Sequence, residues 1–370
     1  MPSLVCIISP AKSLAPNIGM LLPVAKSFPA FIERTEELVA QLRSVRAAEF
    51  KKMMSVSDVI AARTREEYQS FEMNCHSSTD ETPPAHFTQA GLLFDGPAYR
   101  GLCCAALSPE DMQICQQSVR FLSGLYGWLR PGDFIQSHRL EMGTKGLPLP
   151  HGQATLYQFW AAQLVDSLLA DLKPQSGAYP GMLLNCASEE YFKVIDKAAV
   201  AASGRQVKVV TCAFTDKGRV LSVYAKRARG LMARFVSTDG RVRAAMCAAS
   251  LKGGAKGAEA ALLASLQAFN LEGYVFQGMS EDSKSGEITL RYDRAGAVPS
   301  PPNPVPAAAP GSAMAQLQLQ AAGGAGAGAG GTRKRSVEEA GGGGSAAETR
   351  EAASDRGEGK STGTGKRRKA

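Results

Sequence analysis

A capped helical pattern that runs into a Gly-x-x-Gly turn places the strongest restriction on how this chain folds. The pattern begins at Ser108, a residue type that often caps helix N-termini, and a proline and two acidic residues follow in the first turn. Apolar residues then recur at close to helical spacing, so we expect a helix over 108–123. The glycines of the turn are Gly124 and Gly127.

A Gly-x-x-Gly turn between two helices leaves backbone N–H groups unpaired and directed outward, where they suit phosphate oxygens. This is the arrangement of a helix-hairpin-helix, which holds a nucleic-acid backbone without reading its sequence. The alternative is a glycine-terminated helix followed by a tight turn. The turn alone favours this alternative, because Pro131 cuts any second helix short.

Ordered motifs along the chain resemble those of one protein family. The segment Phe121–Asp133 resembles the signature of the YaaA family, the peroxide-stress-resistance proteins. Seven further segments match in the same order: Ile8–Lys12, Phe94–Leu102, Arg139–Gly143, Leu156–Trp160, Asn185–Lys193, Tyr224–Phe235 and Glu272–Tyr274. The resemblance covers residues 1–293 of the chain.

The resemblance implies a single-domain α/β protein of an unusual, compact fold with a helix-hairpin-helix-like element and a basic cleft. It also implies DNA binding and a role in limiting free iron and surviving hydrogen peroxide. It attaches no catalytic reaction to the family.

The composition of the chain changes at Ala295, after which Pro, Ala and Gly dominate. We therefore predict one domain over residues 1–294 and a disordered tail over 295–370, which has too few large apolar residues to offset its ordering entropy. The tail holds 10 Lys/Arg and 6 Asp/Glu, so it carries half of the net charge of +8. The domain is not uniformly basic, and nucleic-acid binding would need a local patch.

The sequence predicts a reduced, cytoplasmic protein. A strand pattern starts directly after the N-terminus and leaves no room for a signal peptide, and no apolar run approaches the length of about 18 residues that a membrane helix needs. Eight cysteines show no C-x-x-C pair and four histidines show no ligand spacing, so we expect no metal and no cofactor. Basic runs at 333–335 and 366–369 make nuclear import an alternative, and a solubilising extension is the plainer interpretation.

Helical and strand patterns are mixed along the domain, which predicts a mixed α/β (α+β) class. The continuous apolar run Leu4–Ile8 is typical of a strand that is buried on both faces. We expect helices at 30–44, 57–72, 155–172, 225–237 and 257–269, strands at 182–186 and 287–292, and hairpins at 87–102 and 207–224. Since these elements do not alternate regularly, the pattern argues against a Rossmann sheet.

The predicted helix 225–237 has an apolar stripe on one side and four basic residues on the other: Lys226, Arg227, Arg229 and Arg234. A charged outer face is usually only solvated. However, Gly230 and Ala233 lie at the centre of this basic face, and an exposed helical glycine costs about 1 kcal/mol relative to alanine. We therefore infer that a phosphate backbone approaches the helix closely there, with Arg227 and Arg234 contacting phosphates.

Ser9 and Lys12 follow the first predicted strand, where open α/β sheets commonly place ligand loops. Lys12 would meet a phosphate with the Ser9 hydroxyl beside it. The alternative is a strand end with a surface lysine. The residues alone leave these interpretations even, and the resemblance favours Lys12 as a site residue.

Acidic residues among the basic ones point to a second class of function. Glu190 and Lys193 follow a buried strand, and Arg139 and Glu141 alternate on a predicted strand, with Arg130 a few residues before them. Bare carboxylates repel phosphates, so this mixture suits a nucleotide-processing enzyme better than a simple DNA clamp. Structural salt bridges and helix capping produce the same pattern.

The sequence therefore predicts a DNA-binding protein of the peroxide stress response. It would protect DNA and limit free-iron damage by sequence-independent phosphate contacts, most simply with double-stranded DNA. The alternative is an enzyme that acts on a nucleotide or base, with Glu190 (or Glu141) as general acid–base, Lys12 on a phosphate and Tyr191 stacking. Phe159 and Trp160 are expected in the core rather than stacked on bases, and no protein partner is predicted.

Overall fold

The apolar run Leu4–Ile8 forms β1, and all five of its side chains are buried. This strand pairs in parallel with β5 (Val119–Ser123) on one side and with β8 (Gly181–Cys186) on the other. Beyond β8, the strands β9 (Val207–Asp216) and β11 (Ile288–Arg294) continue the parallel arrangement. The complete order is β10-β11-β9-β8-β1-β5-β6, with an antiparallel strand at each edge. The burial predicted for Leu4–Ile8 is thus explained by its central position.

The structure is a computed structural model, and it describes residues 4–73, 86–172, 181–204, 207–247 and 254–294. These residues fall within one compact unit, Met1–Pro310, and the predicted disordered tail 295–370 lies outside the described residues. The other helices and strands are β2 Ser13–Leu14, α1 Ile32–Leu42, α2 Ala47–Met54, α3 Asp58–Ser70, β3 Phe87–Gln89, α4 Ala90–Leu93, β4 Phe94–Asp95, α5 Pro97–Leu102, η2 Cys104–Ala106, α6 Pro109–Ser118, β6 Gly127–Leu129, β7 Phe134–Gln136, η3 Pro150–Gly152, α7 Leu156–Asp171, α8 Glu189–Phe192, α9 Lys197–Ala202, α10 Ser222–Thr238, α11 Gly240–Cys247, α12 Gly254–Gln267, η4 Leu271–Gly273 and β10 Tyr274–Glu281.

The parallel strands follow a doubly wound order. Numbered along the chain, β1, β5, β8, β9 and β11 lie in the sheet as 2-1-3-4-5, the order of flavodoxin-like folds. The mixed α/β class is confirmed, whereas the argument against a Rossmann-like sheet was wrong in part. The alternation is hidden in the sequence because residues 9–118, which connect β1 to β5, contain α1 to α6 and three short strands.

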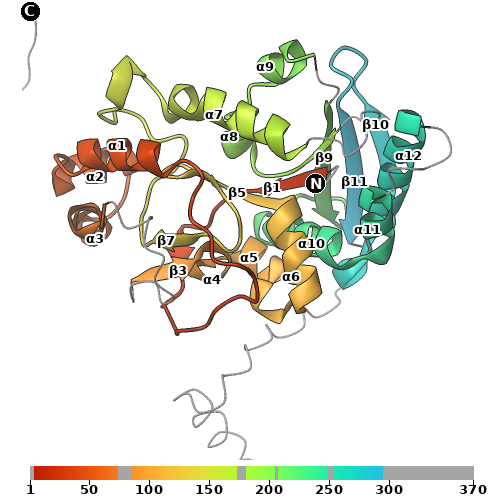
Figure 1. The fold of residues 1–370 in the computed structure, drawn as a ribbon, viewed down its shortest axis with the longest axis horizontal. Helices are drawn as coiled ribbons and strands as arrows, with labels where there is room; N and C mark the ends of the chain where they lie inside the picture. Colours follow the sequence, from red (N-terminus) through yellow and green to blue (C-terminus); the bar gives the residue numbers. More distant parts are fainter. Residues whose placement is uncertain (1–3, 74–85, 173–180, 205–206, 248–253, 295–370) are drawn as a thin grey trace, which may run out of the picture. The chain divides into compact units, whose positions relative to one another are not determined.

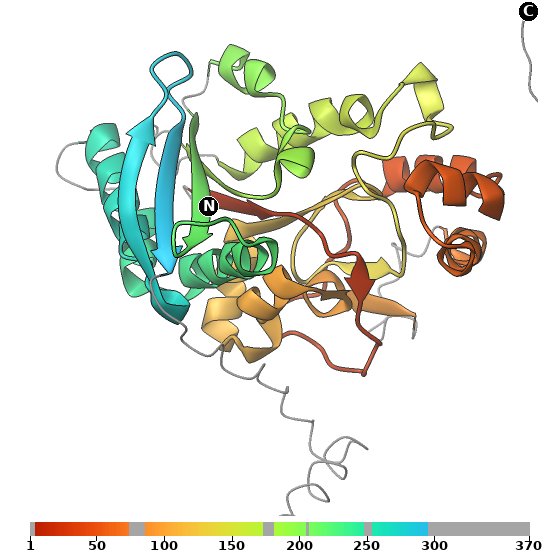
Figure 2. The same cartoon turned by 180° about the vertical axis from the view of Figure 1, so that it is seen from behind.

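Helices cover both faces of the sheet, with α5, α6 and α10 on one side and α7, α8 and α9 on the other (Figure 1; Figure 2 from behind). α10 crosses α5 at very short range. A Cβ atom at Gly230 would lie 1.7 Å from the carbonyl oxygen of Ala98, and one at Gly101 would lie 2.4 Å from that of Arg227. Gly230 is therefore required by helix packing and is buried, so the prediction that a phosphate backbone approaches it was wrong.

The predicted helix-hairpin-helix was also wrong. Ser108 caps α6 as expected, accepting a hydrogen bond from the backbone N–H of Asp111 at 3.1 Å, but the helix ends at Ser118. The next residues form β5 because their apolar side chains fill the core beside β1, and the glycine turn leads into the antiparallel strand β6. A short apolar run fits a helix and a buried strand equally well, and the pairing with β1 decides between them.

The glycines of this turn are buried and serve packing. A Cβ at Gly124 would lie 2.5 Å from the carbonyl oxygen of Leu140, and Gly127 has a φ of +73° beside the Trp160 ring. Within the turn, the N–H groups of Leu125 and Tyr126 donate to Ser123 Oγ, at 3.2 and 3.1 Å. These amides are used inside the protein rather than directed outward.

The remaining predicted helices and strands are confirmed, whereas the predicted hairpins are not. The helices expected at 30–44, 57–72, 155–172, 225–237 and 257–269 are confirmed, as are the strands at 182–186 and 287–292. Both predicted hairpins were wrong. β3 pairs with β7 and β4 with β2, while 97–102 is helical, and β9 is followed by α10 rather than by a second strand. The sequence patterns did not reveal α2 or β10.

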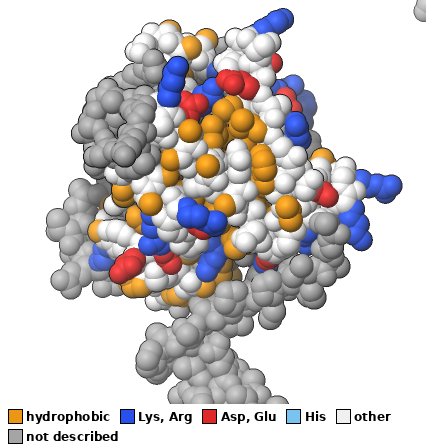
Figure 3. Space-filling view, turned by 90° about the vertical axis from the view of Figure 1, so that its right-hand side faces the viewer, with side chains coloured by type: hydrophobic (Ala, Val, Ile, Leu, Met, Phe, Trp, Pro, Cys, Tyr) orange, Lys and Arg blue, Asp and Glu red, His pale blue; other side chains and the backbone are white. Residues whose placement is uncertain are grey.

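β10 is an edge strand with exposed apolar side chains, among them Val275 and Met279. The register shifts between Phe276 and Gly278, and this bulge interrupts the edge. Figure 3 shows this side of the molecule, where apolar side chains lie centrally and charged ones surround them. Bulges and nearby charges are common protections against edge-to-edge pairing.

Two buried titratable side chains are expected to make the free energy of unfolding depend on pH in opposite directions. Burial raises the pKa of Asp133 to about 6 and lowers that of His138 to about 4. As the pH rises from about 4 to 6, the unfolded chain loses the Asp133 proton before the native chain does, so this group lowers the free energy of unfolding. Over the same range the unfolded chain is the form that holds the His138 proton, so this group raises the free energy of unfolding.

We predict that single substitutions separate these two contributions. Relative to the unmodified protein, His138→Gln should make the slope of unfolding free energy against pH more negative, and Asp133→Asn should make it more positive. Each change should reach about 1.4 kcal/mol per pH unit at most. Urea unfolding at several values between pH 4.5 and 6 measures both slopes, and profiles that stay parallel for all three proteins would contradict the prediction.

Candidate functional site

The carboxyl ends of β1, β5 and β8 border a pocket of about 450 Å³. Ser9 follows β1, Ser123 ends β5 and Ser188 follows β8. Because β5 and β8 lie on opposite sides of β1, this is the topological switch point of the sheet, where open α/β proteins commonly bind ligands. The volume is within the range of small-molecule sites. We call this cavity the switch-point pocket.

Seven of the predicted site residues line the switch-point pocket: Ser9, Lys12, Arg139, Glu141, Glu190, Lys226 and Arg229. They come from four segments that are distant in the sequence and that all belong to the family-like motifs. Tyr191, predicted to stack on a base, lines it as well. The fold therefore brings most of the predicted acidic and basic residues to one place.

Glu141 is held between two cations in the pocket. Lys12 Nζ lies 2.9 Å from its carboxylate, and Arg139 Nη2 lies 3.4 Å from Oε1. The Lys12 side chain is 67% exposed, so its ion pair contributes little to stability and can be exchanged for a ligand contact. Arg139 Nε is buried and has no hydrogen-bond partner within the described part of the chain. Such an orphaned donor costs about 1–3 kcal/mol, and it is common where a ligand supplies the missing acceptor.

Hydrogen bonds join the loops that follow β1 and β8. The backbone N–H of Ser188 donates to Ser9 Oγ at 2.8 Å, and the two hydroxyl oxygens lie 3.2 Å apart. The hydroxyl of Tyr99, from α5, donates to the carbonyl oxygen of Ser9 at 3.2 Å. Ser9 therefore fixes the floor of the pocket, and its hydroxyl is already part of a network.

Glu190 is oriented by a neutral backbone group. Its Oε1 accepts a hydrogen bond from the N–H of Gly143 at 3.1 Å, and its own carbonyl oxygen accepts one from the Tyr157 hydroxyl at 3.0 Å. A Cβ atom at Gly143 would lie 2.9 Å from the same Oε1, so glycine lets the loop approach this carboxylate. The neighbouring Tyr191 is buried, and burial raises the pKa of its phenol, which stays protonated at neutral pH.

Sequence reasoning missed several residues of the pocket wall, chiefly Tyr99 and His138. Tyr99 lies within a matching motif but was assigned to a hairpin, and His138 directly precedes the motif that contains Arg139. Nδ1 of His138 lies 2.9 Å from the carbonyl oxygen of Gln136. Its depressed pKa keeps the imidazole neutral at pH 7.

Two arginines predicted to contact phosphates have internal partners instead. Arg227 forms a largely buried bidentate ion pair with Glu272, at 2.6 to 3.0 Å. Arg234 donates to the carbonyl oxygens of Leu102 and Cys103, at 3.0 and 3.2 Å, and so caps the end of α5. Both side chains connect α10 to neighbouring segments, and their contact with phosphates stays a prediction from the sequence.

The other predicted residues also lie outside the switch-point pocket. Arg130 pairs with Asp171 at 3.4 Å, and Lys193 is largely exposed, 3.8 Å from Glu189. Gly124 and Gly127 lie in the buried turn described above, whereas Phe159 and Trp160 lie in the core as predicted.

The described residues offer neither a metal-binding cluster nor a helix that could cross a membrane. Among them, no group of three or more His, Cys, Asp and Glu side chains is placed to hold a metal ion. No helix in the same part of the chain combines the length and the apolar character that crossing a membrane requires.

The geometry defines a doubly wound α/β protein with a charged pocket at its switch point. The profile of the family described as "Peroxide stress protein YaaA" matches residues 4–253, and the chain belongs to this family. It is 42% identical over 238 residues to a UPF0246 protein of Verminephrobacter eiseniae, covering 63% of this chain and 84% of the relative. It is 36% identical over 289 residues to one of Burkholderia vietnamiensis, covering 76% and 96%.

Proposed function

We propose that this protein acts in the peroxide stress response by binding a nucleotide unit in the switch-point pocket and processing it there. The observation that carries the proposal is the convergence of Lys12, Arg139, Glu141, Glu190 and Tyr191 at the carboxyl ends of three parallel strands. The family description supports the oxidative-stress context. The chemistry of the pocket supports a nucleotide as the ligand.

The basic residues of the pocket suit the phosphate group of a nucleotide. The guanidinium of Arg139, which lines the pocket, would donate charge-assisted hydrogen bonds to phosphate oxygens. Lys12 would exchange part of its contact with Glu141 for the same phosphate, and Lys226 and Arg229 add positive charge to the pocket wall. These four cations make an anionic ligand the best electrostatic match.

The tyrosines of the pocket suit the base of a nucleotide, and its glutamates suit a reaction on it. Tyr99 and Tyr191 supply buried aromatic surface for a planar ring. Glu141 already neutralises two cations, whereas the oxygen of Glu190 is held by an uncharged amide. Glu190 is therefore the better general acid–base, and Glu141 acts by positioning Lys12 and Arg139.

Two sources of the nucleotide fit the pocket, a free nucleotide and a nucleotide within a DNA strand. A free nucleotide and a nucleotide within DNA present the same chemistry to the pocket. Lys12 and Lys226 are exposed as well as pocket-lining, so they could also reach the phosphates that flank a unit within a strand. This observation favours DNA as a second candidate ligand, with protection of DNA and limitation of free-iron damage as its predicted consequences.

Titration calorimetry of the full chain with AMP, adenosine and inorganic phosphate tests the proposal. We expect AMP to bind more tightly than either fragment, and Arg139→Gln to weaken AMP binding by about 10- to 100-fold, the effect of losing hydrogen bonds to a charged group. Arg130→Gln is the matched control, because Arg130 lies outside the pocket and should leave the affinity unchanged.

The same titration with short single-stranded and duplex DNA distinguishes the two sources. If AMP displaces bound DNA, and if Arg139→Gln binds DNA more weakly than the unmodified protein does, the pocket recognises a nucleotide within a strand. Equal affinities of Arg139→Gln and the unmodified protein for every ligand would overturn the assignment of the pocket. A cytoplasmic location, or nuclear entry through the tail, stays a prediction from the sequence.

A further inference from the structure

His138 combines deep burial with access to the switch-point pocket. The residue is 7% exposed, and it lines the pocket. Two aromatic rings fix its imidazole: the ring centroids of Tyr126 and Phe94 lie 5.0 and 6.1 Å away, at interplanar angles of 85° and 78°. Such edge-to-face packing is a preferred geometry of aromatic pairs, so the imidazole is held in one orientation.

The hydrogen bond of His138 Nδ1 decides the state of the other ring nitrogen. Nδ1 lies 2.9 Å from the carbonyl oxygen of Gln136, which can only accept a hydrogen bond, so Nδ1 carries the proton. In a neutral imidazole with this tautomer, Nε2 holds an unprotonated lone pair and acts only as an acceptor. Burial lowers the pKa of His138 to about 4, which keeps the ring neutral at pH 7.

Nε2 of His138 has no hydrogen-bond partner within the described residues. In the same part of the chain, three side-chain nitrogen or oxygen atoms are both fully enclosed and unpartnered, and Nε2 of His138 is not one of them. The atom is therefore accessible, and the cavity that His138 lines is the switch-point pocket. A deeply placed acceptor without a partner is unfavourable, and a ligand that carries a donor removes this cost.

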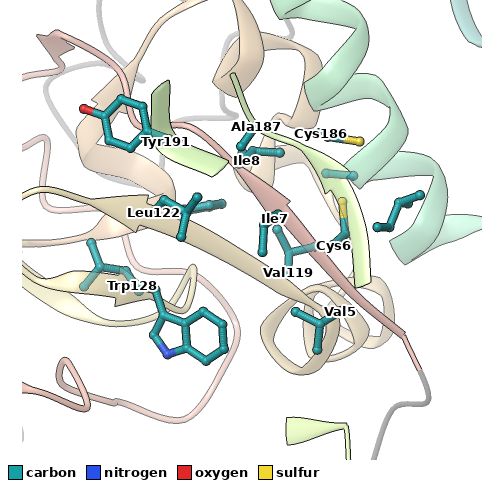
Figure 4. Packing of buried hydrophobic residues seen from close by; sticks show 14 of the residues in the cluster. Val5, Cys6, Ile7, Ile8, Val119, Leu122, Trp128, Cys186, Ala187 and Tyr191 are labelled. Carbon is teal, nitrogen blue, oxygen red and sulfur yellow. The ribbon is translucent and has the colours of Figure 1, made fainter. Parts of the chain in front are cut away.

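His138 belongs to the aromatic part of the pocket wall. Phe94 and Tyr99 also line the pocket, their ring centroids lie 5.0 Å apart, and Phe94 is the ring that packs against His138. Tyr191 adds another ring at the edge of the packed core, with its hydroxyl directed away from Ile8 (Figure 4). Aromatic surface suits a planar base, whereas an acceptor lone pair repels a phosphate. Nε2 of His138 would therefore meet the edge of a base.

We infer that His138 selects nucleotides whose base carries an exocyclic amino group. An amino N–H would donate to Nε2 of His138, whereas a carbonyl oxygen in the same place would set two acceptors against each other. Adenine and cytosine carry such an amino group where hypoxanthine and uracil carry a carbonyl oxygen. The inference rests on the nucleotide ligand proposed above, and it adds the chemical class of the base.

Titration calorimetry of the full chain with a series of purine nucleotides tests the inference without altering the protein. AMP carries the amino group, purine riboside monophosphate has hydrogen in its place, and IMP has a carbonyl oxygen there. We expect the affinity to fall about 10-fold from AMP to purine riboside monophosphate, the effect of one hydrogen bond, and to fall further for IMP. Deoxy-AMP should bind as tightly as AMP, and a loss of affinity for deoxy-AMP alone would make a ribose hydroxyl the donor and overturn the inference.

A substitution assigns the discrimination to His138. His138→Phe keeps an aromatic ring beside Tyr126 and Phe94 but removes both nitrogens, so it should bind AMP and purine riboside monophosphate equally tightly. His151→Phe is the matched control, because His151 is an exposed histidine that lies 3.1 Å from Glu37 and outside the pocket, and it should retain the full discrimination. Unfolding curves of both variants establish that they are folded.

The outcomes separate this inference from the proposed function. If the unmodified protein binds all three purine nucleotides with equal affinity, and each more tightly than inorganic phosphate, the role of His138 is overturned and the nucleotide pocket stands. Discrimination that persists in folded His138→Phe would also overturn this role. If no nucleotide binds more tightly than inorganic phosphate, the proposed function fails and the inference fails with it. The nucleotide series needs no variant, so it decides the inference even if His138→Phe is unfolded.

Discussion

Replacing Gly230 by alanine is expected to lower the free energy of unfolding by about 3 kcal/mol or more, because the crossing of α10 and α5 leaves no room for a methyl group. The new Cβ would lie 1.7 Å from the carbonyl oxygen of Ala98, and both helices would have to separate to relieve the clash. The obstructing atom is backbone, so no side-chain rotation can relieve it. Urea unfolding of the variant measures the effect.

Gly240→Ala is the matched control. Gly240 begins α11, and a Cβ there would meet no heavy atom within 4 Å. This substitution should leave the stability unchanged or raise it by up to about 1 kcal/mol, the difference in helix propensity. Similar unfolding curves for Gly230→Ala and Gly240→Ala would mean that α10 does not approach α5 as described.

Replacing Asp171 by alanine is expected to destabilise the protein by about 3–5 kcal/mol, because it leaves the buried guanidinium group of Arg120 without its carboxylate partner. Arg120 projects from β5, its side chain is 2% exposed, and Asp171 at the end of α7 accepts from it at 2.7 and 2.9 Å. Burial lowers the pKa of Arg120, and the carboxylate of Asp171 opposes this shift. The pair therefore connects the sheet to α7.

Two further variants make the Asp171 prediction specific. Asp166→Ala removes an exposed carboxylate from the same helix and should change the stability by less than about 0.5 kcal/mol. The double variant Arg120→Met with Asp171→Leu removes both charges and should recover much of the loss seen in Asp171→Ala. A loss in the double variant as large as in the single one would assign the effect to shape rather than to charge.

Local signals in the sequence predicted the elements whose ends are fixed by neighbouring residues. Ser108 and Thr155 accept the N-capping hydrogen bonds of α6 and α7, and the apolar run Leu4–Ile8 is the central strand. The same logic indicated the loop that contains Ser9 and Lys12, because the end of a strand is visible in the sequence and ligand loops often follow it, and the family resemblance then favoured Lys12 as a site residue. Ser9, Lys12 and Glu190 of the switch-point pocket could be predicted for this reason.

The rest depends on contacts between distant segments. Arg227 and Arg234 occupy the outer half of an amphipathic helix in any helical wheel, yet their partners, Glu272 and the carbonyl of Leu102, lie 45 and 132 residues away. Gly230 illustrates the same limit, since its neighbour belongs to another helix. Helical periodicity identifies the face of a residue, but it does not reveal whether solvent, a ligand or another helix covers that face.

The switch-point pocket also has a consequence for biosynthesis. A ribosome delivers β1, β5 and β8 before it delivers α10, which supplies Lys226 and Arg229 to the pocket wall. A prematurely released chain that ends before α10 can pair its first parallel strands, but it lacks two of the four cations and leaves the sheet face beneath α10 uncovered. The wall of the switch-point pocket is therefore complete only in chains whose translation has passed Arg229.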